Sequence, residues 1–186
     1  KYEEAMQQYQ KALEIQLKAL GPEHSSTAAT YHSIGRVLYK QGKYEEAMQQ
    51  YQKALEIKLK ALGPEHSSTA GTYHEIGNVL YYQGKYEKAM QQYQKALEIE
   101  MKVYGRGHAS TLTTCYEIGN VLCNLGKYKE ATQQYQTVLE IESKLYGPEH
   151  PSTADTRHEI GNALCKQGVY EAAMQQYQKA LEIKLK

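Results

Sequence analysis

The residues of this sequence best suited to binding a ligand are three asparagines at a fixed spacing, Asn78, Asn120 and Asn162. They recur every 42 residues, and Arg36 holds the corresponding position before them. An asparagine side chain carries both hydrogen-bond donors and an acceptor, so a ladder of them can pair with the backbone of an extended peptide. The alternative interpretation is that these positions are ordinary solvated helix surface.

The positions one helical turn away from this ladder repeat with the same spacing. His32, His74, Tyr116 and His158 lie one turn before it, and Tyr39, Tyr81, Cys123 and Cys165 lie one turn after it. With Lys40 and the ladder itself, these residues complete the candidate binding set. Glu75, Glu117 and Glu159 add negative charge beside it, so we do not expect a ligand that ends in a free carboxylate.

No other pattern in the sequence predicts chemistry. One histidine stands in each expected loop (His24, His66, His108, His150), a full repeat from the next, whereas a metal site needs converging ligands. These histidines are interpreted as loop or cap residues. Neither a phosphate-binding glycine loop nor a catalytic motif is present, so the sequence predicts no metal, no cofactor and no enzyme.

The overall charge argues against nucleic-acid or membrane-surface partners. The chain has 22 basic and 21 acidic residues, a formal net charge of +1, without the basic excess that such partners favour. No apolar run approaches the ~18 residues of a membrane span. The three cysteines, Cys115, Cys123 and Cys165, have no disulfide-framework spacing, which favours a reducing, cytoplasmic location.

The binding candidates must be positioned by a repeated helix pair. The stretch Gly42–Ile57, GKYEEAMQQYQKALEI, recurs with small changes at 84–99, 126–141 and 168–183, and the chain begins inside a further copy. Its apolar residues step by three and four, as in an amphipathic helix, and its tyrosines are predicted to be core residues. A fixed period of this length is typical of a solenoid, in which each repeat packs on its neighbours.

Gly-Pro and Gln-Gly turns divide the chain into two classes of helix. B helices contain the GKYEEAMQQYQKALEI stretch and are predicted at 1–20, 43–62, 85–104, 127–146 and 169–186. A helices carry the asparagine ladder and are predicted at 25–40, 67–82, 109–124 and 151–166. Gly35 and its equivalents stand inside the A helices, which indicates close approach of a neighbour.

The predicted fold is all-α, with nine antiparallel helices in one solenoid over 1–186. It divides into a leading helix and loop, 1–24, and four A–B repeats at 25–66, 67–108, 109–150 and 151–186. Because B helices at both ends lack an A-helix neighbour, we expect the chain to be part of a longer array.

The repeat resembles the tetratricopeptide repeat. The residues that carry the resemblance are Tyr31, Ile34, Gly35 and Leu38, followed by Ala47, Tyr51 and Ala54. The 42-residue length and the GPEHPST run at Gly147–Thr153 are similar to the kinesin-light-chain type of repeat, although His32-Ser33 stands where kinesin light chains have an Asn-Asn pair. The resemblance implies a right-handed superhelix, a concave groove lined by A helices that binds peptides, and no catalytic activity.

Comparison of the first two repeats favours such a groove. Residues 1–42 and 43–84 differ at five positions, and four of the differences fall on one face of the A helix. These are Ala29/Gly71, Ser33/Glu75, Arg36/Asn78 and Lys40/Tyr82; the fifth is Gln16/Lys58. Neutral drift is the alternative, but the polar face of the B helix did not change. The predicted function is a scaffold that binds a protein or peptide; the alternative is a structural array with weak head-to-tail self-association.

Overall fold

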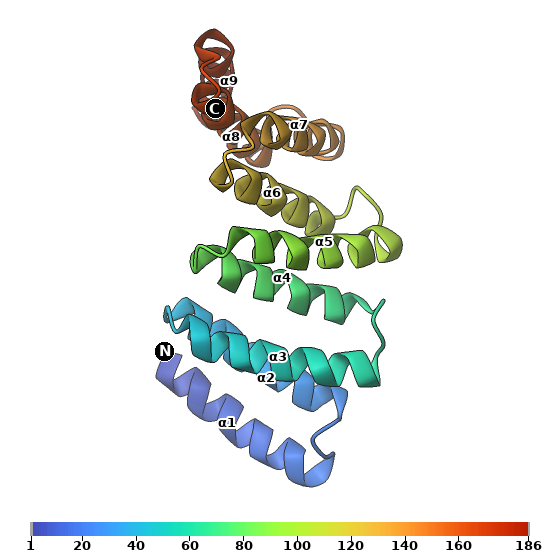
Figure 1. Ribbon diagram of the computed structural model, residues 1–186. Coiled ribbons are helices and arrows are strands. Elements are labelled where there is room, and N and C mark those ends of the chain that lie inside the picture. Colours follow the sequence, from blue (N-terminus) through green and yellow to red (C-terminus); the bar gives the residue numbers. More distant parts are fainter. Residues whose placement is uncertain (1, 186) are drawn as a thin grey trace. The chain divides into compact units, whose positions relative to one another are not determined.

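The computed structural model describes residues 2–185, and every regular element among them is an α-helix (Figure 1). The B helices are α1 (Tyr2–Ala19), α3 (Tyr44–Ala61), α5 (Tyr86–Val103), α7 (Tyr128–Leu145) and α9 (Tyr170–Lys184). The A helices are α2 (Ser25–Lys40), α4 (Ser67–Tyr82), α6 (Ala109–Asn124) and α8 (Pro151–Lys166). The all-α prediction is confirmed. The A-helix bounds are as predicted, and the B helices are slightly shorter than predicted at each end; Lys1 and Lys186 lie outside the described residues.

The chain forms two compact units, Lys1–Val103 and Tyr104–Lys186. In the first unit each helix from α1 to α5 packs on the next, and α2 also contacts α4. In the second unit α6 packs on α7, α7 on α8 and α8 on α9. Consecutive helices run in opposite directions within each unit (Figure 1). Packing between neighbours along the chain is how a solenoid repeat buries its apolar faces.

Each A helix begins at a histidine cap. His24, His66, His108 and His150 are the N-cap residues, and the Nδ1 atom of each accepts a hydrogen bond from the backbone N–H two residues later. The prediction of loop or cap histidines is therefore confirmed. The turn from an A helix to a B helix needs a glycine, because Gly42 has a φ of 76°, where a side chain would be strained.

The core of each helix pair is a tyrosine from the B helix. Tyr51, Tyr93 and Tyr135 are 0% exposed, as predicted for this position, whereas Tyr9 and Tyr177 at the same position of the first and last B helices are only half-buried. The prediction is wrong for the tyrosine in the first turn of the B helix. Tyr44, Tyr86 and Tyr128 are only half-buried, and Tyr2 and Tyr170 are exposed, because that turn lies at the edge of the helix pair.

The glycine inside each A helix makes room for the buried tyrosine ring. A Cβ atom added at Gly77 would lie 2.6 Å from Cε1 of Tyr93, and one added at Gly35 would lie 2.8 Å from the Tyr51 ring. Gly119 and Gly161 have the same relation to Tyr135 and Tyr177. The expected close approach is confirmed: the ring packs directly on the backbone of the A helix.

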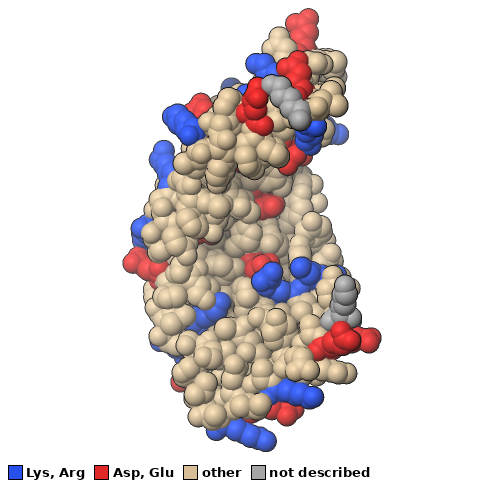
Figure 2. Space-filling view, turned by 180° about the vertical axis from the view of Figure 1, so that it is seen from behind, with Lys and Arg blue, Asp and Glu red and all other residues tan. Residues whose placement is uncertain are grey.

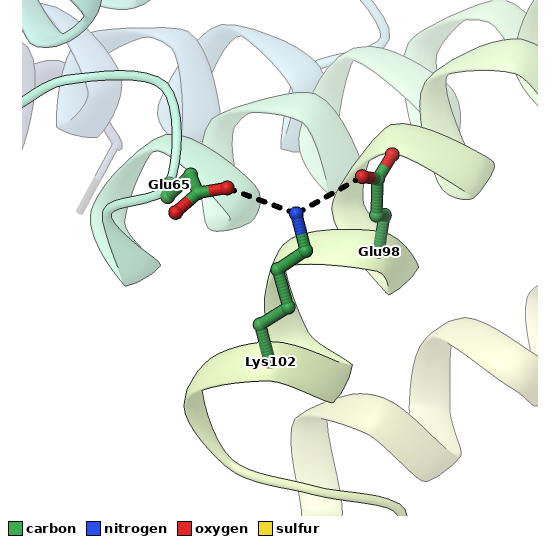
Figure 3. A network of polar contacts seen from close by, with 3 residues as sticks. All are labelled: Glu65, Glu98 and Lys102. Carbon is green, nitrogen blue, oxygen red and sulfur yellow. Dashed lines mark hydrogen bonds and ion pairs between the residues drawn. The ribbon is translucent and has the colours of Figure 1, made fainter.

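Exposed ion pairs tie successive repeats together within the first unit. Lys102 on α5 reaches Glu98 one turn before it, at 3.2 Å, and Glu65 in the loop before α4, at 2.9 Å (Figure 3). Lys60 pairs in the same way with Glu56 and Glu23. Because these side chains are more than half exposed, water screens the pairs and they contribute little to stability. None of the described helices is long and apolar enough to cross a membrane.

Candidate functional site

Three of the four ladder positions are fixed by the same two hydrogen bonds. The hydroxyl of Tyr93 on α5 donates to Oδ1 of Asn78 on α4 at 2.7 Å, and Nδ2 of Asn78 donates to Glu75 at 3.2 Å. Tyr135, Asn120 and Glu117 repeat the arrangement in the second unit, with distances of 2.5 and 3.0 Å. Tyr177, Asn162 and Glu159 repeat it again, at 2.8 and 3.1 Å. We call each set a Tyr–Asn–Glu trio.

The trio both completes the core and orients the asparagine. A buried hydroxyl without a partner would be costly, and the asparagine oxygen supplies its acceptor. The amide is only half-buried, and one N–H and one acceptor lone pair remain unused after the two bonds. Each trio therefore presents a fixed donor and acceptor on the face of the A helix that varies between repeats.

The first repeat has no trio. Arg36 replaces the asparagine and is exposed, and Ser33 replaces the glutamate and donates to its own helix at Ala29 O. The hydroxyl of Tyr51 is buried and has no hydrogen-bond partner among the described residues. Burial and the nearby Glu75 carboxylate raise the pKa of Tyr51, so this hydroxyl stays protonated.

The predicted aromatic positions one turn before the ladder pack against the buried tyrosines. His32 and Tyr51 have ring centroids 5.3 Å apart, and His74 lies 5.4 Å from Tyr93. Tyr116 and His158 pack in the same way on Tyr135 and Tyr177. Burial, with Lys58 and Arg36 nearby, lowers the pKa of His32 to about 4, so this ring is neutral at pH 7. His158 alone among these four is exposed.

The positions one turn after the ladder differ between the units. In the first unit Tyr39 contacts Tyr44 and Tyr82, with centroids 5.8 and 5.7 Å apart. Tyr81 contacts Tyr82 and Tyr86, which joins these rings into one aromatic cluster. In the second unit the corresponding residues are free thiols: Cys123, whose pKa is raised by burial, and the exposed Cys165.

The two basic candidates, Arg36 and Lys40, lie together. They line a hollow of about 320 Å³ in the first unit, next to Ser33 and Val37 of α2 and the rings of Tyr2 and Tyr9 of α1. The predicted site residues thus lie in three different environments. Asparagines are held in trios, histidines and Tyr116 pack on the core, and Arg36 and Lys40 face an open hollow.

A buried polar position late in the B helices was not predicted from the sequence. Lys58 is 4% exposed, and its Nζ donates to Ser68 O at 3.0 Å and to Thr72 Oγ1 at 2.8 Å. The same position holds Gln16, which accepts from Thr30, and Glu142, which accepts from Thr156. Burial lowers the pKa of Lys58 to about 8 and raises that of Glu142. The Gln16/Lys58 difference was the available signal, together with the threonine that is present in every A helix.

Comparison with known proteins agrees with this geometry. The family model described as tetratricopeptide repeat matches residues 1–60, 49–102, 68–116 and 108–186. A search among curated proteins found no match.

Solved structures with the same fold include a kinesin-light-chain-like protein of Podosopora anserina with nearly identical TPR-like repeats. Its sequence is 26% identical to this chain, and the two structures superpose with a TM-score of 0.85. The alignment covers 98% of this chain and 87% of that one. BtubC (BKLC) from P. vanneervenii has a TM-score of 0.90 at 19% identity, over 99% of this chain and 73% of that one. The apo form of RapI has a TM-score of 0.85 at 23% identity, over 98% and 64%.

Proposed function

Because the chain belongs to the tetratricopeptide repeat family, we propose that it is a non-catalytic scaffold that binds a peptide segment of another protein along its A helices. The observation that carries this proposal is the Tyr–Asn–Glu trio, present at Asn78, Asn120 and Asn162. The tyrosine hydroxyl bonded to each amide oxygen orients the amide before a ligand arrives, so less side-chain freedom is lost on binding.

The chemistry of the A-helix face favours the backbone of a peptide as the ligand. Each asparagine keeps one donor and one acceptor, which match the alternating N–H and C=O groups of an extended chain. The glutamates beside them, Glu75, Glu117 and Glu159, disfavour a ligand with a free carboxyl terminus.

The surface charge favours a protein partner over a nucleic acid or a membrane. Basic and acidic side chains are interspersed on the face shown in Figure 2, and most of that face is uncharged. A nucleic-acid or lipid surface would favour a continuous basic stripe. None of the three cysteines, all among the described residues, is in a disulfide, which supports a reducing compartment such as the cytoplasm.

The test is to select peptides on the purified protein from a displayed random library and to measure their affinities by fluorescence anisotropy. The blocking variant is Gly71→Tyr with Thr113→Tyr, which adds two rings to the variable face of α4 and α6. A Cβ atom added at Gly71 would meet no heavy atom within 4 Å, and Thr113 is exposed, so neither change replaces a core side chain. The matched control is Gln94→Tyr with Gln136→Tyr, which adds two rings at exposed positions of B helices.

We expect the blocking variant to weaken selected peptides about tenfold or more, whereas the control variant binds like the wild type. Failure to select any peptide would contradict the proposal. Peptides weakened equally by both variants would contradict it too, because the A-helix face would then have no special role.

A second candidate function is weak end-to-end self-association. It is favoured by exposed apolar side chains of α9 and its C-cap: Met174 is 66% exposed, Leu181 51% and the C-cap Leu185 77%. Sedimentation from micromolar to millimolar protein is expected to show concentration-dependent association that Met174→Glu with Leu181→Glu removes and Gln175→Glu with Gln178→Glu leaves intact. A strict monomer over the whole range would rule this function out.

A further inference from the structure

The second unit contains an acidic hollow of about 400 Å³ between α6, the end of α7 and the start of α8. Three carboxylates line it, Glu142, Asp155 and Glu159, and none of its lining residues is lysine or arginine. Rings of Tyr116, Tyr146 and His158 form the rest of its polar lining together with serine and threonine hydroxyls. Tyr116, His158 and Glu159 belong to the variable side of the A helices, so the hollow opens where a bound peptide would lie.

Glu142 is the unusual member of this set. It is only 8% exposed, and its Oε2 accepts a hydrogen bond from Thr156 at 2.7 Å. No described side chain donates to its Oε1, and no described cation pairs with its charge. Burial raises its pKa, although His150 nearby acts in the opposite direction and Asp155 in the same one. A buried carboxylate without a counter-charge is costly, and an arriving cation would remove that cost.

The other carboxylates are already engaged at the rim. Asp155 pairs with Lys184 at 2.8 Å, and both side chains are more than half exposed. Glu159 accepts from Asn162 in its trio at 3.1 Å. The hollow therefore holds three negative charges against one exposed lysine at its edge, and the deepest of the three is the one without a cation.

In the first unit the equivalent position holds Gln16, Lys58 and Glu100, and Glu100 is also a buried carboxylate, 4% exposed. The Nζ of Lys58 donates hydrogen bonds to Ser68 O and Thr72 Oγ1, and the neutral side chain of Gln16 accepts one from Thr30. Neither Lys58 nor Gln16 places a negative charge at this position. Glu142 places a carboxylate at the same buried position, beside a hollow large enough for a long side chain.

We propose that this hollow binds the cationic side chain, arginine or lysine, of the partner peptide, with Glu142 as its buried counter-charge. The inference rests on the proposed function, because it places one residue of the peptide on the A-helix face. A guanidinium can donate two parallel hydrogen bonds to the carboxylate and pack its plane on a tyrosine ring. An ammonium can pair with the charge but makes fewer directed bonds.

The test uses N-acetyl-arginine amide as the probe and follows the backbone amide resonances of the protein during titration. N-acetyl-lysine amide is the second cationic probe. N-acetyl-citrulline amide is the control, because it has the shape of arginine without the charge. We expect saturable shifts at α6 and α8 with both cations, larger for arginine, and none with citrulline.

The decisive variant is Glu142→Gln, which keeps the size of the side chain and removes the charge. We expect it to weaken the arginine probe about tenfold or more. Glu140→Gln removes one charge from an exposed position of the same helix and is expected to leave binding unchanged. Equal behaviour of the two variants, or equal shifts with citrulline, would overturn the inference. The spectra of the free variants report whether each is folded.

The two proposals fail in different ways. If selected peptides depend on the A-helix face but are indifferent to Glu142→Gln, and the arginine probe does not bind, the cation site is wrong and the scaffold function stands. If no peptide can be selected but the probe binds through Glu142, the scaffold function is wrong, and the hollow binds a cation without the peptide that the inference assigns to it.

Discussion

The helix pairs α2–α3 and α4–α5 lie in the same unit and pack the same tyrosine on the same glycine, yet the hydroxyls of those tyrosines differ in bonding. Tyr93 donates to Asn78, whereas Tyr51 is equally buried and has no partner because Arg36 replaces the asparagine. A residue on the variable face of the A helix therefore also decides whether a buried tyrosine hydroxyl has a hydrogen-bond partner. Diversification of that face therefore has a cost in stability.

A similar contrast exists between the two hollows. Arg36 and Lys40 line the one between α1 and α2, whereas Glu142, Asp155 and Glu159 line the one between α6 and α8. The hollows occupy different places in the repeat: the first lies between the start of a B helix and the end of an A helix, and the second lies between the end of a B helix and the first halves of two A helices. Under the proposed function, the two hollows would therefore favour ligand side chains of opposite charge.

Both buried tyrosines, Tyr51 and Tyr93, are expected to stabilise their helix pairs equally. We expect Tyr51→Ala and Tyr93→Ala each to lower the free energy of unfolding by ~3–5 kcal/mol, because a fully buried aromatic ring is removed. The controls are Gln52→Ala and Gln94→Ala, exposed neighbours whose removal is expected to change stability by less than ~0.5 kcal/mol. Urea melts in which the two classes of variant were equal would show that the core is misassigned.

Replacing each of two glycines of α4 by alanine is expected to change the free energy of unfolding in opposite directions. Gly77→Ala brings a Cβ within 2.6 Å of the Tyr93 ring and is expected to destabilise by ~1–3 kcal/mol through overpacking. Gly71→Ala meets open space and is expected to stabilise by ~0.4–1 kcal/mol, because the unfolded chain loses freedom. Thermal or urea unfolding of both variants measures the difference, and a loss of stability from both would contradict it.

The buried Lys58 gives the first unit a pH dependence that the neutral residue at the Gln16 position would not give. Its pKa is about 8 in the folded protein against an ordinary value of 10.5, so between these pH values the unfolded chain binds more protons. Wild-type stability relative to Lys58→Gln should therefore rise over this window, by ~2 kcal/mol, and stay at its lower level below pH 8.

Urea melts of the two proteins between pH 7 and about 10 measure this change, and titration of the tyrosines in the unfolded state cancels in the difference. Lys60→Gln is the control. Hydrogen bonds to Glu23 and Glu56 raise the pKa of the exposed Lys60, so this residue gives no gain in stability as the pH rises. A difference between wild type and Lys58→Gln that falls with pH would contradict the burial of a charged lysine.

The smallest expected change in stability comes from removing the tyrosine hydroxyl, and it tests whether the first repeat lacks a trio. Tyr93→Phe removes a hydroxyl bonded to Asn78 and is expected to cost ~0.5–1.5 kcal/mol. Tyr51→Phe removes a hydroxyl without a partner and is expected to be neutral or stabilising. Arg36→Asn in the wild type is expected to stabilise, since it supplies the missing acceptor. If Tyr51→Phe cost as much as Tyr93→Phe, the two repeats would not differ in the way described.

Much of the fold could be predicted because the repeat amplifies each local signal. The A-helix bounds, the tyrosine of the Tyr51 class and the close approach at Gly35 are all as predicted. The candidate site was harder. Spacing placed Asn78, Asn120 and Asn162 on one face of their helices, but their bonds to tyrosines run between two helices and have no local signature.

The sequence by itself determined the helices, their order and the family, because helical periodicity, turn glycines and histidine caps are local and recur in every repeat. Only the tertiary structure decided that the histidines of the A-helix face pack on core rings, that Tyr51 has no partner, and that Lys58 and Glu142 are buried. The physical reason is that burial and pairing depend on the distance between neighbouring helices. From the sequence alone, a charged residue is expected at the surface, and only the packing of the next A helix shows that it is buried.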